Sequence, residues 1–242
     1  MNFKIVGNPN NPKILLIHAM FVSSDSFEAL SEYLKEDYFL IIPTLDGHDV
    51  NENSIFMSLE DEADKILSYL KQNNIENLDF ILGTSLGAII AFELYKRNEV
   101  QINKVFLDGG PFFNFGPFLQ TIAFKKFWGI CNSIRKDSKN ALKKLDSLFP
   151  GSGNNMLQVC SHITMLSVRN LAHACYSFSL PKLDEAAQKP IIFLYGTKEP
   201  ARMCIPRLRR YKYSAIIKKV GYKHCGYLLS NPKDYARMLN EK

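Results

Sequence analysis

The segment Gly83-Thr84-Ser85-Leu86-Gly87 carries the residue types and spacing best suited to covalent chemistry in this sequence. It fits the pattern G-x-S-x-G. It follows the apolar run 78–83, where we expect a strand, and precedes 88–97, where we expect a helix. A sharp strand-to-helix turn strains and exposes a serine, and the N–H groups that open the helix point towards it. We therefore predict that Ser85 is a nucleophile rather than an ordinary turn residue.

A serine nucleophile needs a base, and His224 is the histidine best placed for that role. It follows the last predicted strand and precedes the final predicted helix, in the sequence GYKHCGYLL. The carboxyl ends of parallel strands lie at one edge of a sheet, so His224 can meet Ser85 there. His162 and His173 lie in a helical region. On one helix they would be about 16 Å apart, too far to bind one metal ion.

The elements that must position these residues alternate along the chain as strands and helices. Most of the strand runs are apolar throughout, which is typical of parallel strands that are covered on both faces. The predicted strands span 3–6, 13–18, 38–43, 78–83, 104–108, 190–195 and 214–220. The predicted helices span 23–34, 59–73, 88–97 and 232–240. This order indicates an α/β fold with a mainly parallel, doubly wound sheet.

One region interrupts the alternation. Residues 111–188 contain no convincing strand, and helical patterns cover 123–134, 138–148 and 155–177. Since this region is too long for a simple loop, we predict an all-helical insertion in a core formed by 1–110 and 189–242. Its many Phe residues and its single Trp, Trp128, could line a pocket or form a small core of the insertion itself.

Composition limits the class of protein. Hydrophobic residues make up 46% of the chain and charged residues 22%, as in ordinary globular proteins. The five cysteines form no CxxC pair, which argues against a disulfide framework or a thiolate metal site. The sequence shows neither a signal-peptide pattern nor an apolar run long enough to span a bilayer. We therefore expect a cytoplasmic protein that does not bind membranes.

The net charge of +6 arises largely from one segment, 202–223, which has many Lys and Arg residues and no acid. Such a segment could attract acidic substrates, membranes or nucleic acid. It lacks any known nucleic-acid motif, so we interpret it as a solvated helix face followed by a strand with charged ends. We expect no nucleic-acid partner.

Over its whole length the sequence resembles the α/β-hydrolase superfamily. The resemblance rests on the GTSLG turn and on five other segments: His18-Ala19-Met20, Pro43-Thr44-Leu45-Asp46-Gly47-His48, Leu107-Asp108-Gly109-Gly110, Leu194-Tyr195-Gly196-Thr197-Lys198-Glu199 and His224-Cys225-Gly226. The insertion 111–188 occupies the place of that family's cap, between its sixth and seventh core strands. The chain order of nucleophile, acid and histidine also matches.

The resemblance implies roles for further residues. Relatives usually carry Asp where this sequence has Glu199, and some place the acid at the end of the preceding strand, where Asp108 stands. The oxyanion hole would consist of the N–H groups of Leu86 and Met20. Relatives usually have Gly where this chain has Ala19, so the loop must differ if that Gly has a positive φ.

The function implied is that of a serine hydrolase. It would cleave a small carboxylic ester or related acyl substrate through a Ser-His-Glu triad and an acyl-enzyme, without cofactor or metal. Phe21 and Trp128 are the expected substrate-binding residues. The same fold also serves C–C bond hydrolases, lactonases, thioesterases and amidases, and a slow small-molecule sensor is a further alternative.

Overall fold

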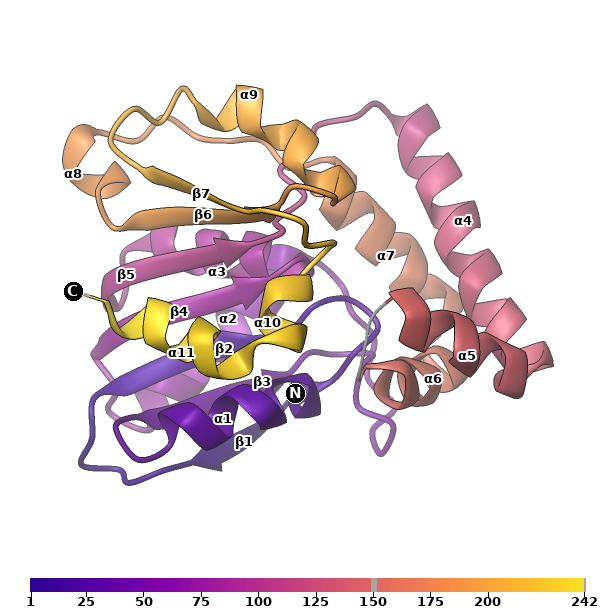
Figure 1. Ribbon diagram of the computed structural model, residues 1–242, viewed down its shortest axis with the longest axis horizontal. Coiled ribbons are helices and arrows are strands. Elements are labelled where there is room, and N and C mark those ends of the chain that lie inside the picture. Colours follow the sequence, from indigo (N-terminus) through magenta and orange to yellow (C-terminus); the bar gives the residue numbers. More distant parts are fainter. Residues whose placement is uncertain (149–151, 242) are drawn as a thin grey trace.

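A computed structural model describes residues 1–148 and 152–241, and for 144–148 it describes the backbone. Its core is a seven-stranded sheet in the order β1-β3-β2-β4-β5-β6-β7 (Figure 1). Strand β1 runs antiparallel to β3, and the other neighbouring pairs are parallel. The predicted mainly parallel sheet is thereby confirmed. The strands are β1 Asn2–Val6, β2 Lys13–Ile17, β3 Phe39–Thr44, β4 Asn77–Thr84, β5 Gln101–Asp108, β6 Ile191–Gly196 and β7 Ala215–Lys219.

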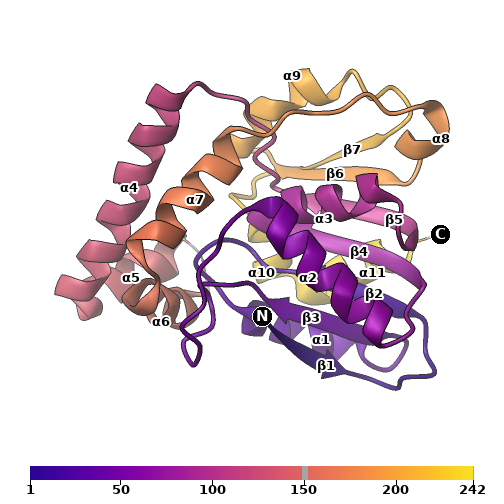
Figure 2. The ribbon, with the colours of Figure 1, turned by 180° about the vertical axis from the view of Figure 1, so that it is seen from behind.

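Helices cover both faces of the sheet (Figures 1 and 2). One face carries α1 (Glu28–Leu34), α10 (Gly226–Ser230) and α11 (Pro232–Asn240), and the other carries α2 (Leu59–Gln72) and α3 (Leu86–Arg97). Successive strand residues supply the two cores, since side chains alternate along a strand. In β2, Ile14 and Leu16 pack in the cluster with α1 and α11, whereas Leu15 and Ile17 pack in the cluster with α2 and α3.

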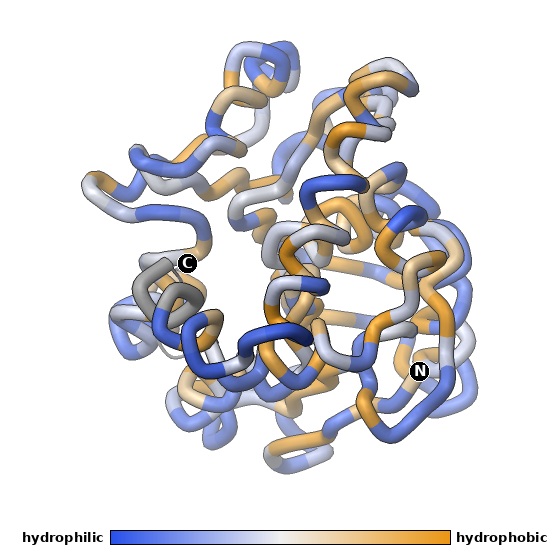
Figure 3. Tube along the Cα trace, turned by 90° about the vertical axis from the view of Figure 1, so that its right-hand side faces the viewer, coloured by the Kyte–Doolittle hydropathy of each residue, from blue (hydrophilic) through white to orange (hydrophobic). Residues whose placement is uncertain are grey.

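Burial on both faces explains why the central strands have no polar alternation. Figure 3 shows the hydrophobic strands inside and helices that alternate between hydrophobic and hydrophilic residues around them. Helix α2 also begins where the sequence predicts a helix start. The Ser58 hydroxyl accepts a hydrogen bond from the Asp61 N–H at 3.1 Å. Acidic residues in the first turn complement the positive end of the helix dipole.

Between β5 and β6 the chain forms four longer helices beside the carboxyl edge of the sheet (Figure 1). They are α4 Pro117–Lys136, α5 Ser138–Leu148, α6 Gly153–His162 and α7 Met165–Tyr176. We call α4–α7 the cap helices. The ends of α4 and α7 show that these two helices run antiparallel. His173 is hydrogen-bonded to Gln120 near one end, and Arg135 donates to the Ile163 carbonyl near the other.

The predicted single helix over 155–177 is wrong, because the structure has two helices there. Helix α6 ends at His162 and α7 begins at Met165. Thr164 lies between them in an extended conformation, and its hydroxyl accepts a hydrogen bond from the Ser167 N–H at 3.1 Å. A capping residue therefore starts a new helix within a continuous apolar pattern. His162 and His173 consequently lie on different helices.

The remaining elements are short: η1 Ser24–Phe27, α8 Glu185–Gln188, η2 Pro200–Cys204 and α9 Ile205–Leu208. The basic segment 202–223 spans η2, α9 and β7. Some of its basic side chains make contacts within the fold. Arg207 donates to the Phe112 carbonyl at 3.0 Å, and the Lys219 ammonium lies 4.2 Å from the ring centre of Tyr227. Across the described residues, no helix has the length and apolar character needed to cross a membrane.

Candidate active site

Ser85 occupies the turn between β4 and α3 and has a strained backbone, with φ 53° and ψ −111°. A positive φ is costly for a residue with a side chain, so the surrounding contacts must hold this conformation. One of them is the hydrogen bond from the Ser85 N–H to the Asp108 carbonyl, at 2.7 Å. It ties the turn to the end of the neighbouring strand β5.

The two glycines that flank Ser85 allow backbone segments to approach each other. A Cβ atom at Gly83 would collide with the Gly87 backbone, and one at Gly87 would collide with the Ile17 and His18 carbonyls. The spacing of the motif is therefore a packing requirement. Helix α3 lies against the ends of β2 and β4 so closely that neither glycine can carry a side chain.

His224 and Glu199 form a close pair beside this turn. The distance from His224 Nδ1 to Glu199 Oε2 is 2.6 Å. The other carboxylate oxygen of Glu199 accepts the Gly196 N–H at 2.5 Å, and the side chain is fully buried. An ionised carboxylate beside Nδ1 favours the imidazole tautomer with the proton on Nδ1, which leaves Nε2 free to accept a proton.

The surroundings of His224 favour its charged form. Burial acts to lower the pKa, but the Cys225 sulfur and the Glu199 carboxylate outweigh it and raise the pKa of His224 well above its ordinary value. Burial raises the pKa of the Cys225 thiol itself. Glu199 is the carboxylate within hydrogen-bond distance of the ring and so stabilises the imidazolium.

Asp108, the alternative acid, has a different partner. Its Oδ2 accepts a hydrogen bond from the Tyr235 hydroxyl on α11 at 2.9 Å, and both side chains are buried. Burial and the nearby charge of Glu199 raise the pKa of Asp108 to about 7. Tyr235, on the C-terminal helix α11, thus contributes a hydrogen-bond donor to the carboxyl edge of the sheet. Sequence reasoning missed it, since nothing in the local pattern of α11 marks it.

Gly109 makes room for the His224–Glu199 pair and was also missed as a site residue. Its φ is +65°, and a Cβ there would lie 2.8 Å from His224 Cε1 and 3.0 Å from Glu199 Oε2. The positive φ and the lack of space for a Cβ atom both require glycine at this position. The Leu107-Asp108-Gly109-Gly110 segment was the available signal, although the sequence does not reveal which group the glycine must admit.

The loop after β2 carries the predicted oxyanion donor Met20. His18 fixes this loop. Its Nδ1 lies 2.8 Å from the Ala19 carbonyl, and its Nε2 accepts the Leu45 N–H at 3.0 Å. Burial, with a smaller effect of His48, lowers the pKa of His18 to about 3, so the ring is neutral. Ala19 is not among the positive-φ residues, whereas Phe21 has φ 68°. The left-handed turn of this loop therefore lies at Phe21, and Ala19 fits without strain.

A cavity of about 820 Å³ lies between the sheet edge and the cap helices. The core contributes to its lining Met20, Phe21, Ser85 and His224. The cap contributes Lys126, Phe127, Ile130, Met156 and Tyr176, which sequence reasoning did not single out. The rings of Phe21 and Phe127 pack edge to face at 5.9 Å and so join the loop after β2 to α4.

Trp128 and Leu86 lie outside the lining of this cavity. Trp128 is half-buried on α4, and the Arg135 guanidinium lies 4.8 Å from its ring centre. The predicted contact of Trp128 with substrate therefore has no counterpart in the lining of this cavity. Leu86 is the first residue of α3, and its side chain is buried in the core. Its predicted role uses only its backbone N–H.

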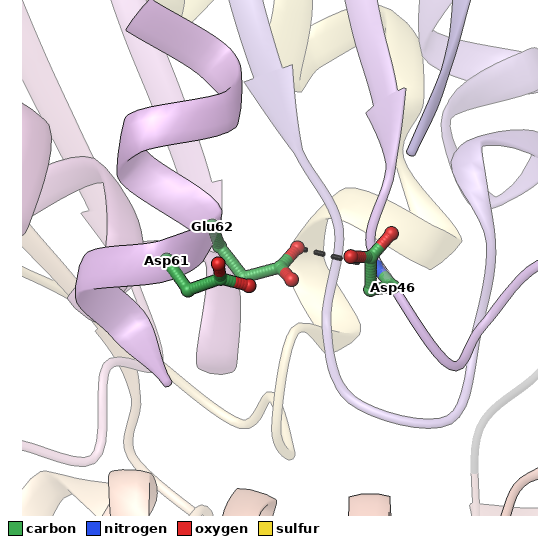
Figure 4. Close-up of side chains that lie close together, drawn as sticks. All are labelled: Asp46, Asp61 and Glu62. Atoms are coloured by element: carbon green, nitrogen blue, oxygen red, sulfur yellow. Dashed lines mark hydrogen bonds between the residues drawn. The ribbon is translucent and has the colours of Figure 1, made fainter. Parts of the chain in front are cut away.

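A second group of acidic side chains lies away from this cavity. Ligand-type oxygen atoms of Asp46, Asp61 and Glu62 lie within 4.8 Å of one another (Figure 4). The Asp46 N–H donates to Glu62 Oε2 at 3.2 Å, and the Lys65 ammonium pairs with both aspartates. Burial and the charge of Asp46 raise the pKa of Glu62 to about 8. Because Lys65 already supplies a cation, we interpret this group as an ion-pair network joining α2 to the loop after β3.

The chain belongs to the alpha/beta hydrolase fold family, whose model matches residues 12–172. This result confirms the resemblance seen in the sequence. Membership of the family supports a hydrolase activity. No curated protein matches the sequence.

Solved structures extend the likeness to nearly the full chain. A protein assigned to the alpha/beta hydrolase family from Desulfitobacterium hafniense is similar with a TM-score of 0.75 at 23% identity, covering 99% of this chain and 98% of that one. An esterase from a marine microorganism has a TM-score of 0.75 at 17% identity, covering 98% and 97%. The enol-lactonase from Burkholderia xenovorans has a TM-score of 0.72 at 13% identity, covering 99% and 94%. At these identities the likeness establishes the fold.

Proposed function

We propose that the chain is a serine hydrolase that cleaves a carboxylic ester or a related acyl substrate. The observation that carries the proposal is the His224–Glu199 pair, at 2.6 Å, on a cavity that a strained Ser85 also lines. A strained serine, a histidine oriented by a buried carboxylate and an apolar cavity together match the requirements of nucleophilic acyl transfer.

In the proposed reaction, Ser85 Oγ attacks the substrate carbonyl while His224 Nε2 takes its proton. Glu199 keeps the proton of the imidazole on Nδ1 and stabilises the imidazolium. The N–H groups of Leu86 and Met20 bind the oxyanion, each contributing about 10²–10³-fold to the rate. His224 then protonates the leaving group, and a water activated by His224 hydrolyses the acyl-enzyme.

The cavity argues for a substrate with a substantial apolar part. Its volume of about 820 Å³ lies within the upper range of small-molecule sites, and its walls are mostly apolar side chains. A short-chain ester would fill only a fraction of this space. We therefore expect that activity on 4-nitrophenyl esters rises from acetate to octanoate.

The test compares wild-type protein with the variants Ser85→Ala and Ser133→Ala on 4-nitrophenyl octanoate. Ser133 also lines the cavity, but its hydroxyl donates to the Gly129 carbonyl, so it is a matched control. We expect a loss of at least about 10³-fold for Ser85→Ala and near-normal turnover for Ser133→Ala. Equal turnover by wild type and Ser85→Ala would refute the proposal. Covalent labelling of Ser85 without appreciable turnover would favour the sensor alternative.

Lactone opening is a second candidate, because the enol-lactonase from Burkholderia xenovorans shares the fold over almost the whole chain. A lactone is a cyclic ester and would react through the same acyl-enzyme. Turnover of aromatic and aliphatic lactones alongside linear esters of the same carbon number would separate the two candidates.

A further inference from the structure

The charge on the lining of the cavity is unevenly distributed. Among the described residues that line the cavity, Lys126 is the charged one apart from the titratable His224, and none of them carries a carboxylate. The lining also includes uncharged polar side chains, such as those of Ser26, Thr84 and Tyr176. Over its described lining, the cavity is therefore mostly apolar, with one lysine and no acidic side chain to neutralise it.

Lys126 is held on the side of α4 that faces the cavity. It shares this side with Gly129, Ile130 and Ser133, which follow at spacings of three, four and seven residues and also line the cavity. Lys126 itself is exposed, and a lysine in such a position keeps its ammonium in water while its stem can cover apolar surface. Within the described residues, no hydrogen bond or salt bridge engages this ammonium.

The surrounding cap adds to the positive field. Between residues 117 and 143 the cap carries one acid, Asp137, and six basic residues: Lys125, Lys126, Arg135, Lys136, Lys139 and Lys143. The hydrogen bonds of Asp137 go to Asn140, so it does not neutralise Lys126. A cleft with charge of one sign and low-dielectric walls concentrates ligands of the opposite sign.

We propose that the natural substrate combines an apolar body with an anionic group, and that the Lys126 ammonium binds this group. The proposal rests on the serine hydrolase function above and names the class of substrate for that site. A carboxylate, phosphate or sulfate would each supply the charge. The anionic group could belong to the acyl part or to the leaving group, and the experiment distinguishes these two sources.

Two pairs of esters test the proposal. For the acyl part, the mono-4-nitrophenyl ester of suberic acid is compared with 4-nitrophenyl octanoate, which has the same chain length and no charge. For the leaving group, the octanoate ester of 4-hydroxybenzoate is compared with that of methyl 4-hydroxybenzoate. We expect the anionic member of one pair to have at least about 10-fold higher kcat/KM, mainly through KM, with the preference falling as salt rises.

The variants assign the preference to one residue. Lys126→Ala should abolish the preference and Lys126→Glu should reverse it, whereas Lys125→Ala should retain it. Lys125 is the adjacent exposed lysine of α4 and does not line the cavity. The inference is overturned if wild-type protein shows no preference for the anionic esters, or if Lys126→Ala keeps the preference unchanged. In either case, Ser85-dependent turnover of the neutral esters would still uphold the proposed function. If no ester of either pair is hydrolysed in a Ser85-dependent manner, the proposed function and the inference both fail.

Discussion

The carboxyl edge of the sheet and the cap helices hold their residues in different ways. At the sheet edge, backbone packs against backbone and side chain so closely that a methyl group at Gly109 would meet His224 Cε1 at 2.8 Å. By contrast, a methyl group at Gly116, which precedes α4, or at Gly129, which lies on α4 and lines the cavity, would meet nothing within 4 Å. The cap also exposes large apolar side chains, with Phe118 at 76% and Ile122 at 47%.

This difference separates two tasks. The sheet edge constrains a few groups through many backbone contacts, which is the accurate positioning that the proposed acyl transfer would need. The cap surrounds a large apolar space with side chains and tolerates change. Substitutions at the sheet edge should therefore affect the rate of the chemical step, and substitutions in the cap should affect substrate choice or stability.

The largest expected effect at the sheet edge is that of Glu199→Gln. We expect kcat/KM to fall by about 10³–10⁴-fold, because glutamine cannot stabilise the imidazolium. His224 must be neutral to accept the serine proton, so activity rises as pH rises through its pKa. Glu199 raises that pKa. In the variant the rise should therefore occur at lower pH, as a kcat/KM–pH profile would show.

Asp108→Asn is the control for this prediction. Asp108 binds Tyr235, so its loss should reduce kcat/KM far less than the loss of Glu199. The opposite ranking of the two variants would make Asp108 the triad acid.

A smaller effect is expected for Gly109→Ala. Its positive φ disfavours alanine, and the new methyl group would press on the His224–Glu199 pair. A displaced imidazole should lower kcat by about 10²-fold with little change in KM. Steady-state kinetics on a neutral ester measure both. Wild-type kcat in this variant would show that the sheet edge is less constrained than its packing indicates.

Tyr235→Phe tests the hydrogen bond from Tyr235 to Asp108 at the end of β5. It removes the buried hydroxyl that donates to Asp108 and should lower the free energy of unfolding by about 1–3 kcal/mol. The rate should change little, since Tyr235 does not line the cavity. Urea unfolding measures the effect. Tyr227→Phe on α10 is a matched control, because the Tyr227 ring packs beside Tyr235. An equal loss in both variants would remove the special role of the Asp108 hydrogen bond.

The smallest effect is expected in the cap, for Gly129→Ala. Glycine in a helix interior costs about 0.5–1 kcal/mol relative to alanine, and the new methyl group has space here. We therefore expect a modest gain in the free energy of unfolding and nearly unchanged turnover of 4-nitrophenyl octanoate. Thermal unfolding and ester kinetics check both. Gly129 lines the cavity, so the methyl group would enter that space, and a loss of stability would contradict this placement.

The sequence by itself determined the architecture of the core. Continuous apolar runs predicted parallel strands covered on both faces, because such strands have no solvent-facing side. Gly83 and Gly87 marked a tight strand-to-helix turn, since only glycine allows the backbone approach that this turn needs. The chain order placed His224 after the last strand, at the edge that all parallel strands share. These are local patterns or consequences of topology, and both can be read from one chain.

The tertiary structure decided how residues from separate segments meet. Whether Glu199 or Asp108 reaches His224 depends on the relative positions of three chain segments. The sequence left both open, and the structure pairs His224 with Glu199 and Asp108 with Tyr235. The arrangement of the cap helices also depended on tertiary structure. Helical periodicity predicted its helices but not that α7 begins at Met165 behind the capping residue Thr164. It also did not predict that Phe127 and Lys126 rather than Trp128 line the cavity, because the direction in which a helical side chain faces depends on how the helices pack against each other and against the core.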